Sequence, residues 1–272
     1  MKRQKIMQTD VKVRMNSKKK NNLKLVIAYE GTSYRGWQRL GPSDTESIQG
    51  ILENALADVL NAKVEITGAS RTDAGVHAKG QVANFITGNP IDIDKLKYMV
   101  NRKLPSSIQV SHIDKVPLSF HSRFLSKGKI YEYLIDNGEK QRVFTRNLSL
   151  WIPERLDVKK MQDAAMYLVG THDFSGFSNS MKDGRSTVRT ISSIQISKVE
   201  EMITIQVIGD GFLYNMIRII VATLIEIGKG KREMDSIHTI LRIKDRTLAA
   251  DTISGCGLCL KQVLYLNNQI TP

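Results

Sequence analysis

The order of strand-like and helix-like segments constrains this fold most, because one order occurs twice along the chain. In each half, apolar residues alternate at the strand period or recur at helical spacing in the order β-α-β-β-α-β. The segments of the first half are residues 23–29, 47–60, 64–66, 81–86, 93–101 and 108–113. Those of the second half are residues 129–136, 158–169, 190–199, 202–208, 214–227 and 258–265, with an additional short helix at 234–241.

This order predicts an α+β protein made of two ferredoxin-like, or RRM-like, halves. Their antiparallel sheets would adjoin around a central basic cleft, with helices on the other face. We expect a basic, disordered N-terminal extension at residues 1–22, an N-terminal domain at 23–120 and a C-terminal domain at 121–272. The same order occurs in RNA-recognition domains, so it does not decide between an enzyme and a binding module.

The positive charge of the chain is concentrated at its N-terminus, since residues 1–24 contribute +8 of the formal net charge of +13. The rest of the chain is also basic and therefore suits a polyanionic partner. Its basic residues in or near predicted loops include Arg35, Arg39, Arg71, Lys79, Arg102, Lys103, Arg123, Lys127 and Lys129. No apolar run approaches the roughly 18 residues of a membrane span, and no apolar stretch of a secretory signal is present. We therefore expect a cytoplasmic protein with no membrane insertion.

A glycine-bounded loop at residues 68–77 carries the residues with the most distinctive chemistry. Arg71, Asp73, Gly75 and His77 lie close together in this loop, between two strand-like runs. A carboxylate on such a turn can reach a ligand that lies over the sheet. Taken alone, an aspartate in a turn more often bonds its own backbone, and a nearby arginine more often forms a surface ion pair. The loop becomes a candidate active site because distant segments fit the same chemistry.

The two cysteines, Cys256 and Cys259, have the C-x-x-C spacing of a redox pair or of half a zinc site. Zinc normally takes four ligands, and the chain has no second cysteine pair and only scattered histidines. We expect both cysteines to be small, partly apolar residues in a buried strand. The sequence also has no phosphate-cradling P-loop, so it predicts neither a metal site nor a cofactor.

Several separate motifs resemble, in the same order, those of the TruA-type tRNA pseudouridine synthases. The resemblance runs from about residue 23 to the C-terminal strand. The motifs are Y-R-G-W-Q-R at 34–39, S-I-Q-G at 47–50, S-R-T-D-A-G-V-H-A at 70–78, H-S-R-F at 121–124, K-I-Y-E-Y at 129–133, G-F-L-Y-N-M-I-R at 211–218, K-D-R at 244–246 and G-L at 257–258. So many matches in one order do not arise by chance.

The resemblance implies a homodimer that converts uridine to pseudouridine at positions 38 to 40 of the tRNA anticodon arm. This reaction breaks the N1–C1′ glycosidic bond, rotates the uracil and rejoins it through C5, without metal, cofactor or external energy. The resemblance implies that Asp73 is the catalytic residue and that Arg218 pairs with it. It also implies that Arg71 helps to occupy the space left by the displaced base.

The chemistry of these side chains fits the implied roles. An ionised aspartate can serve as a nucleophile, or as the base of an elimination, without a partner histidine. Desolvation would raise its pKa, and a guanidinium from Arg71 or Arg218 would oppose that rise while holding the carboxylate by a bidentate contact. Tyr131 would stack on the extruded uracil, its hydroxyl helping to remove the C5 proton, and Leu258 would form the apolar wall opposite. Without the resemblance, Tyr131 and Leu258 would be ordinary strand and core residues.

Further substrate contacts are expected from basic residues and one histidine. These are His77, Arg35, Arg39, Arg123 and Lys129. His77 is not expected to act as a general base, because the aspartate needs no proton relay. Loop packing is the alternative to its contact with RNA.

Other functions remain open on the sequence alone. A non-catalytic tandem RRM-like protein would read tRNA by charge and shape and would not require Asp73. A paralogous pseudouridine synthase would modify another uridine or another RNA. A zinc-dependent base deaminase requires a metal signature that the C-x-x-C spacing does not supply. The sequence predicts no role for the loop at residues 180–187.

Overall fold

The fold is that of a computed structural model, which describes residues 20–41, 44–88, 90, 92–179 and 184–266. Most of the expected N-terminal extension, and residues 180–183 of the loop with no predicted role, lie outside these described residues. None of the helices in the described part of the chain is long and apolar enough to cross a membrane.

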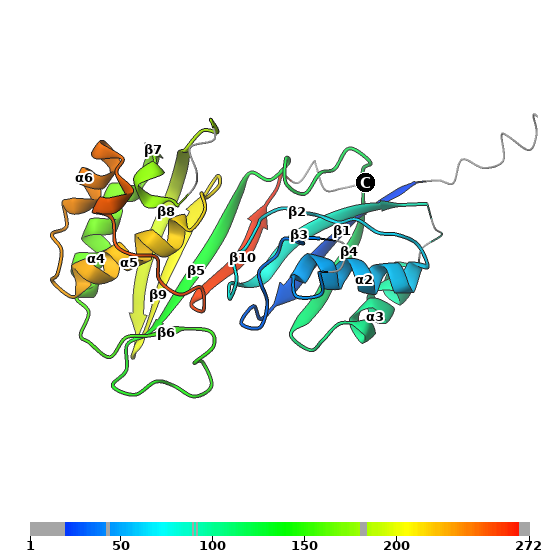
Figure 1. The fold of residues 1–272 in the computed structure, drawn as a ribbon, viewed down its shortest axis with the longest axis horizontal. Coiled ribbons are helices and arrows are strands. Elements are labelled where there is room, and N and C mark those ends of the chain that lie inside the picture. The colour runs from blue at the N-terminus through cyan, green and yellow to red at the C-terminus, as the bar shows by residue number, and fades with distance from the viewer. Residues whose placement is uncertain (1–19, 42–43, 89, 91, 180–183, 267–272) are drawn as a thin grey trace, which may run out of the picture.

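All ten strands of the described residues belong to one sheet (Figure 1). The strands are β1 (Asn21–Tyr29), β2 (Thr67–Gly68), β3 (His77–Thr87), β4 (Ile108–Val116), β5 (Gly128–Asp136), β6 (Leu150–Trp151), β7 (Gly170–Asp173), β8 (Val188–Val199), β9 (Met202–Gly209) and β10 (Leu258–Leu264). Their order is β4-β1-β3-β10-β5-β9-β8-β7, with β2 added on β3 and β6 on β5. The mixed composition and the largely antiparallel pairing confirm the α+β class.

The junction between the two halves is closer than the expected pair of adjoining sheets. The last strand, β10, lies between β3 of the first half and β5 of the second half. It pairs antiparallel with β5, and it joins β3 in parallel through Cys259 opposite His77 and Leu260 opposite Ala78. Backbone hydrogen bonds therefore connect the halves into one continuous sheet, which fixes the strand after the Asp73 loop relative to β5.

The helices form two groups, one near each end of the sheet. They are α2 (Ile48–Leu60), α3 (Ile93–Lys103), α4 (Val158–Ala165), α5 (Met216–Gly228) and α6 (Ser236–Ile243). Figure 1 shows α2 and α3 beside the N-terminal strands, and α4, α5 and α6 together at the opposite end. Ser47, Asp92 and Asp157 cap α2, α3 and α4 by accepting a hydrogen bond from a main-chain N–H of the first turn.

Helix α5 is buried nearly all round, unlike an amphipathic surface helix. Eleven of its thirteen residues are buried, and the two exceptions are Arg218 and Glu226. A charged side chain on such a helix is costly unless it is paired. Arg218 is paired, because its guanidinium contacts the carboxylate of Asp73.

Segment 64–66 is not a strand, contrary to the expectation from its alternating residues. The N–H of Ile66 donates to Glu53 Oε1 at 2.9 Å, and its carbonyl accepts from Gln49 Nε2 at 3.1 Å. Because side chains of α2 bind both main-chain groups of Ile66, pairing with β3 begins only at Thr67 opposite Asn84.

Two further expectations need correction. The helix expected at 158–169 ends at Ala165 and continues as a single 3₁₀ turn. The cysteines do not share a buried strand, because Cys256 lies in the turn before β10 and only Cys259 lies within it. Both cysteines are free and half-buried.

Candidate active site

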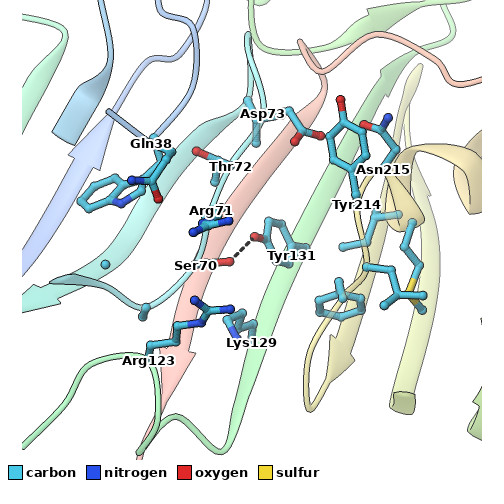
Figure 2. A pocket seen from close by; sticks show the side chains of 18 of the residues that line it. Gln38, Ser70, Arg71, Thr72, Asp73, Arg123, Lys129, Tyr131, Tyr214 and Asn215 are labelled. Atoms are coloured by element: carbon cyan, nitrogen blue, oxygen red, sulfur yellow. Dashed lines mark hydrogen bonds between the residues drawn. The ribbon is translucent and has the colours of Figure 1, made fainter. Parts of the chain in front are cut away.

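A cavity of about 640 Å³ lies where the Asp73 loop, β5 and the start of α5 meet. The Asp73 loop supplies residues 67–73 and Val76, β5 supplies Lys129 and Tyr131, and residues 212–218 lead into α5. Leu258 from β10 and residues 185–187 complete much of the wall. Figure 2 shows Asp73 beside Tyr214 and Asn215, Tyr131 near Ser70 and Arg71, and Arg123 beside Lys129.

The carboxylate of Asp73 pairs with Arg218, whose position on the buried helix α5 brings the two together. Arg218 Nη1 donates to Asp73 Oδ2 at 3.2 Å and to Asn215 Oδ1 at 2.8 Å. Arg218 Nε donates to the carbonyl of Ile253 at 2.7 Å. The contact with the carboxylate is thus a single-point one, not the expected bidentate contact, because other acceptors take the remaining directions of the guanidinium.

The environment of Asp73 raises its pKa. Burial is the larger cause, because it disfavours the charged carboxylate, and the Arg218 guanidinium opposes it through its charge and its hydrogen bond. Asp73 is the one acidic residue among the described residues that line the cavity. A partly desolvated carboxylate with a single cationic partner and an accessible face is suited to act as a nucleophile or a base.

Tyr131 lies in the cavity wall with its ring almost fully buried. Its hydroxyl lies 3.0 Å from Ser70 Oγ, and its ring makes an edge-to-face contact with Phe212 at a centroid distance of 5.4 Å. Burial, countered in part by the bond to Ser70, raises the pKa of Tyr131 to about 12. The phenol is therefore neutral at physiological pH, and its ring has a fixed orientation.

Hydrogen bonds hold the Asp73 loop from the side of β1. The N–H of Trp37 donates to the carbonyl of Thr72 at 3.0 Å, and the hydroxyls of Tyr29 and Thr72 lie 2.8 Å apart. Gly36 has φ 97°, and a Cβ there would lie 2.4 Å from the carbonyl oxygen of Thr72. Glycine is needed at this position because the loop backbone passes directly against it.

We expect Gly36→Ala to reduce both stability and activity, whereas Gly75→Ala should have the smaller effect on each. Both glycines have positive φ, so both substitutions carry roughly 1–3 kcal/mol of backbone strain. A Cβ at Gly75 meets no atom within 4 Å, so only the change at Gly36 forces the loop to move. Urea unfolding and initial rates on tRNA would measure the difference; equal losses in the two variants would contradict it.

Arg71, Arg123 and Lys129 are three of the cations on the cavity wall. Within the described residues, the side chains of Arg71, Arg123 and Lys129 have no hydrogen-bond or ion-pair partner. Burial and then the charge of Arg123 lower the pKa of Lys129, while Asp210 raises it. Unneutralised cations that share one cavity favour an anionic ligand.

Three predicted contact residues lie elsewhere. His77 is buried at the start of β3, where Nδ1 accepts from the N–H of Gly31 at 2.9 Å and Nε2 bonds to the carbonyl of Cys256 at 2.9 Å. This position favours the loop-packing alternative for His77. Arg35 pairs with Glu46, and Arg39 Nη1 lies 3.1 Å from the buried Glu53 Oε2. None of the three lines the cavity.

The structure also brings in residues that the sequence did not single out. Arg185, Arg189, Gln38 and Tyr214 line the cavity, as does Asn215. Three of them had a signal, because Gln38 stands in the motif at 34–39, and Tyr214 and Asn215 stand in the motif at 211–218 that contains Arg218. In the described part of the chain, no three His, Cys, Asp or Glu side chains are grouped to hold a metal ion.

Comparison with known proteins gives consistent matches over most of the chain. A family model described as tRNA pseudouridine synthase matches residues 25–125 and 164–266. A tRNA pseudouridine synthase A of Acetivibrio thermocellus is 42% identical over 244 residues, which are 90% of this chain and 99% of the relative. The corresponding protein of Bacillus sp. (strain KSM-64) is 45% identical over 245 residues, which are 90% of this chain and 100% of the relative. A crystal structure of a Cbf5-Nop10-Gar1 complex aligns with a TM-score of 0.34 at 13% identity, over 88% of this chain and 48% of that chain, which is too low to bear on the fold.

Proposed function

This chain belongs to the TruA-type family of tRNA pseudouridine synthases and isomerises uridine in tRNA, and we propose that Asp73 is the catalytic carboxylate of that reaction. The observation that carries the proposal is the contact of Arg218 with Asp73 in a cavity with no other lining acid among the described residues. Arg218 favours the ionised form of the half-buried carboxylate and orients it, so its free oxygen can attack C1′ or take a ribose proton.

In either route the atoms balance without a co-reactant. The C1′–N1 bond breaks, the uracil rotates, and a new C1′–C5 bond forms. C5 then loses its proton and N1 gains one. Asp73 is regenerated as the carboxylate, because C5 displaces its oxygen from C1′ in the nucleophilic route, and because it returns the ribose proton in the elimination route.

The target uridine has to leave the base stack before its C1′ can be reached. We assign Tyr131 as the surface that receives the uracil, with Leu258 as the apolar neighbour and Arg71 in the space that the base leaves. The fixed, buried ring of Tyr131 and the exposed side chain of Arg71 support these roles. With a pKa of about 12, the Tyr131 hydroxyl is poised to donate a hydrogen bond rather than to abstract a proton unaided.

Arg123 and Lys129 are proposed to bind phosphates of the tRNA strand next to the target. Counterion release makes such contacts salt-dependent. We expect Lys129→Gln and Arg123→Gln each to reduce the slope of log affinity against log salt by about 1. Filter binding over a salt series measures this slope. Lys159→Gln, on the exposed part of α4, is the matched control and should leave it unchanged; unchanged slopes in the two cavity variants would remove these cations from the RNA site.

The target within tRNA is proposed to be the anticodon arm, at positions 38, 39 and 40. Support comes from the motif resemblance alone, so the test maps every pseudouridine. Chemical mapping at single-nucleotide resolution should show these positions losing pseudouridine in cells that lack the gene and regaining it on expression of the wild-type chain. Loss at another site would identify a paralogous specificity.

The proposal also covers the location, oligomeric state and domains of the protein. We propose a cytoplasmic homodimer, with domains at 23–120 and 121–272 that are each ferredoxin-like. The strand order within each half supports the last point, since β1 lies between β4 and β3 and β5 lies between β10 and β9. Sedimentation equilibrium tests the dimer.

A further inference from the structure

We propose that Tyr214 stacks on a nucleobase next to the target uridine, so that the cavity holds two bases and not one. The proposal rests on the proposed function, which places the target uracil on Tyr131 and its sugar at Asp73.

Tyr214 differs from the other aromatic residues of the cavity wall in its exposure. Among the described lining residues, the side chains of Trp37 and Tyr131 are 2% and 5% exposed, and Phe212 is half-buried. Tyr214 is 56% exposed, and its hydroxyl has no hydrogen-bond partner within the described residues. An exposed ring on the wall of a basic cavity is the feature by which proteins hold single-stranded bases.

Backbone contacts hold Tyr214 beside Asp73 and Arg218. Its carbonyl accepts from the N–H of Asn179 at 3.2 Å and from Ser178 Oγ at 3.1 Å. The next residue, Asn215, adopts the left-handed conformation with φ 61°, and its side chain accepts from Arg218. Because Arg218 also binds Asp73, the ring stands next to the carboxylate, as Figure 2 shows.

The base on Tyr214 is not the target uracil, because the proposed function places the uracil on Tyr131 with Leu258 as its apolar neighbour. Tyr131 lies on β5, and Tyr214 lies before α5 on the same side as Asn215. A neighbouring nucleotide of the same strand is the base that can reach Tyr214 while the target sugar lies at Asp73. Its contribution is to anchor the strand and not to react.

The test is a coupling experiment between protein and RNA variants. Unmodified tRNA transcripts carry one abasic nucleotide at each position within two of the target uridine, and their dissociation constants and turnover are measured with wild type, Tyr214→Phe and Tyr214→Leu. We expect Tyr214→Leu to raise Kd and KM about tenfold with little change in kcat, and Tyr214→Phe to match wild type, since stacking needs the ring and not the hydroxyl. Tyr98→Leu, an exposed tyrosine on α3, is the control.

At one flanking position, wild type should bind the abasic RNA about tenfold more weakly than the intact RNA. Tyr214→Leu should bind these two RNAs equally well. Independent effects at every position would overturn the proposal, as would a kcat loss in Tyr214→Phe, which would give the hydroxyl a chemical role. Absence of turnover with wild type would contradict the proposed function instead, and the coupling in Kd would still decide the stacking.

Discussion

Asp73→Asn is expected to lower the rate of uridine isomerisation by roughly 10³-fold or more, because the amide can neither attack C1′ nor accept a ribose proton. The tRNA affinity should stay near that of wild type, since Asp73 adds a negative charge to a cavity that otherwise attracts phosphates. Release of tritium from [5-³H]uridine tRNA measures the rate, and filter binding measures the affinity.

Loss of fold does not account for the expected loss of activity in this variant. Burial raises the pKa of Asp73 above its ordinary value of 3.8, so the fold loses stability as the pH rises from that value through the raised pKa, and this loss stays constant at higher pH. Asparagine removes this charge and keeps an oxygen for Arg218. Thermal unfolding at neutral pH should therefore be unchanged or shifted upward. If Asp73→Asn retained full tritium release, the proposed catalytic role of Asp73 would be wrong.

The sequence motifs singled out residues that lie far apart along the chain, and the fold brings them to one cavity. Asp73, Tyr131, Arg218 and Leu258 come from four different segments and line one cavity. The sequence could not predict the direction of each side chain. His77 is only four residues from Asp73, yet it begins β3 and points to main-chain partners in the interior.

The remaining differences have causes that lie outside local sequence. Arg39 is a loop cation by its position, but the buried Glu53 of α2 takes it as a partner. The single sheet depends on the pairing of Cys259 with His77 and of Leu260 with Ala78, which are about 180 residues apart and carry no periodic signal. Alternation and helical spacing predict elements, whereas long-range pairing decides how the elements join.

Arg218→Gln should reduce activity at neutral pH by about 10²-fold, with the loss growing as the pH falls. Removing the guanidinium leaves burial unopposed, so the pKa of Asp73 rises further. Because the ionised carboxylate is the active form, the acid limb of the pH–rate profile should move to higher pH. Arg218→Lys keeps a positive charge near Asp73, although it loses the bonds to Asn215 and the Ile253 carbonyl. Its acid limb should lie between those of wild type and Arg218→Gln.

This order of the three profiles separates an electrostatic role for Arg218 from a purely structural one. A structural role would lower the rate by the same factor at every pH and would lower the melting temperature in parallel, because α5 packs on all sides. An electrostatic role shifts the midpoint of the acid limb even in protein that remains folded. Rates measured on tRNA between pH 5 and 9, with thermal unfolding followed in the same buffers, distinguish the two. Coincident midpoints for all three proteins would show that Arg218 does not control the ionisation of Asp73.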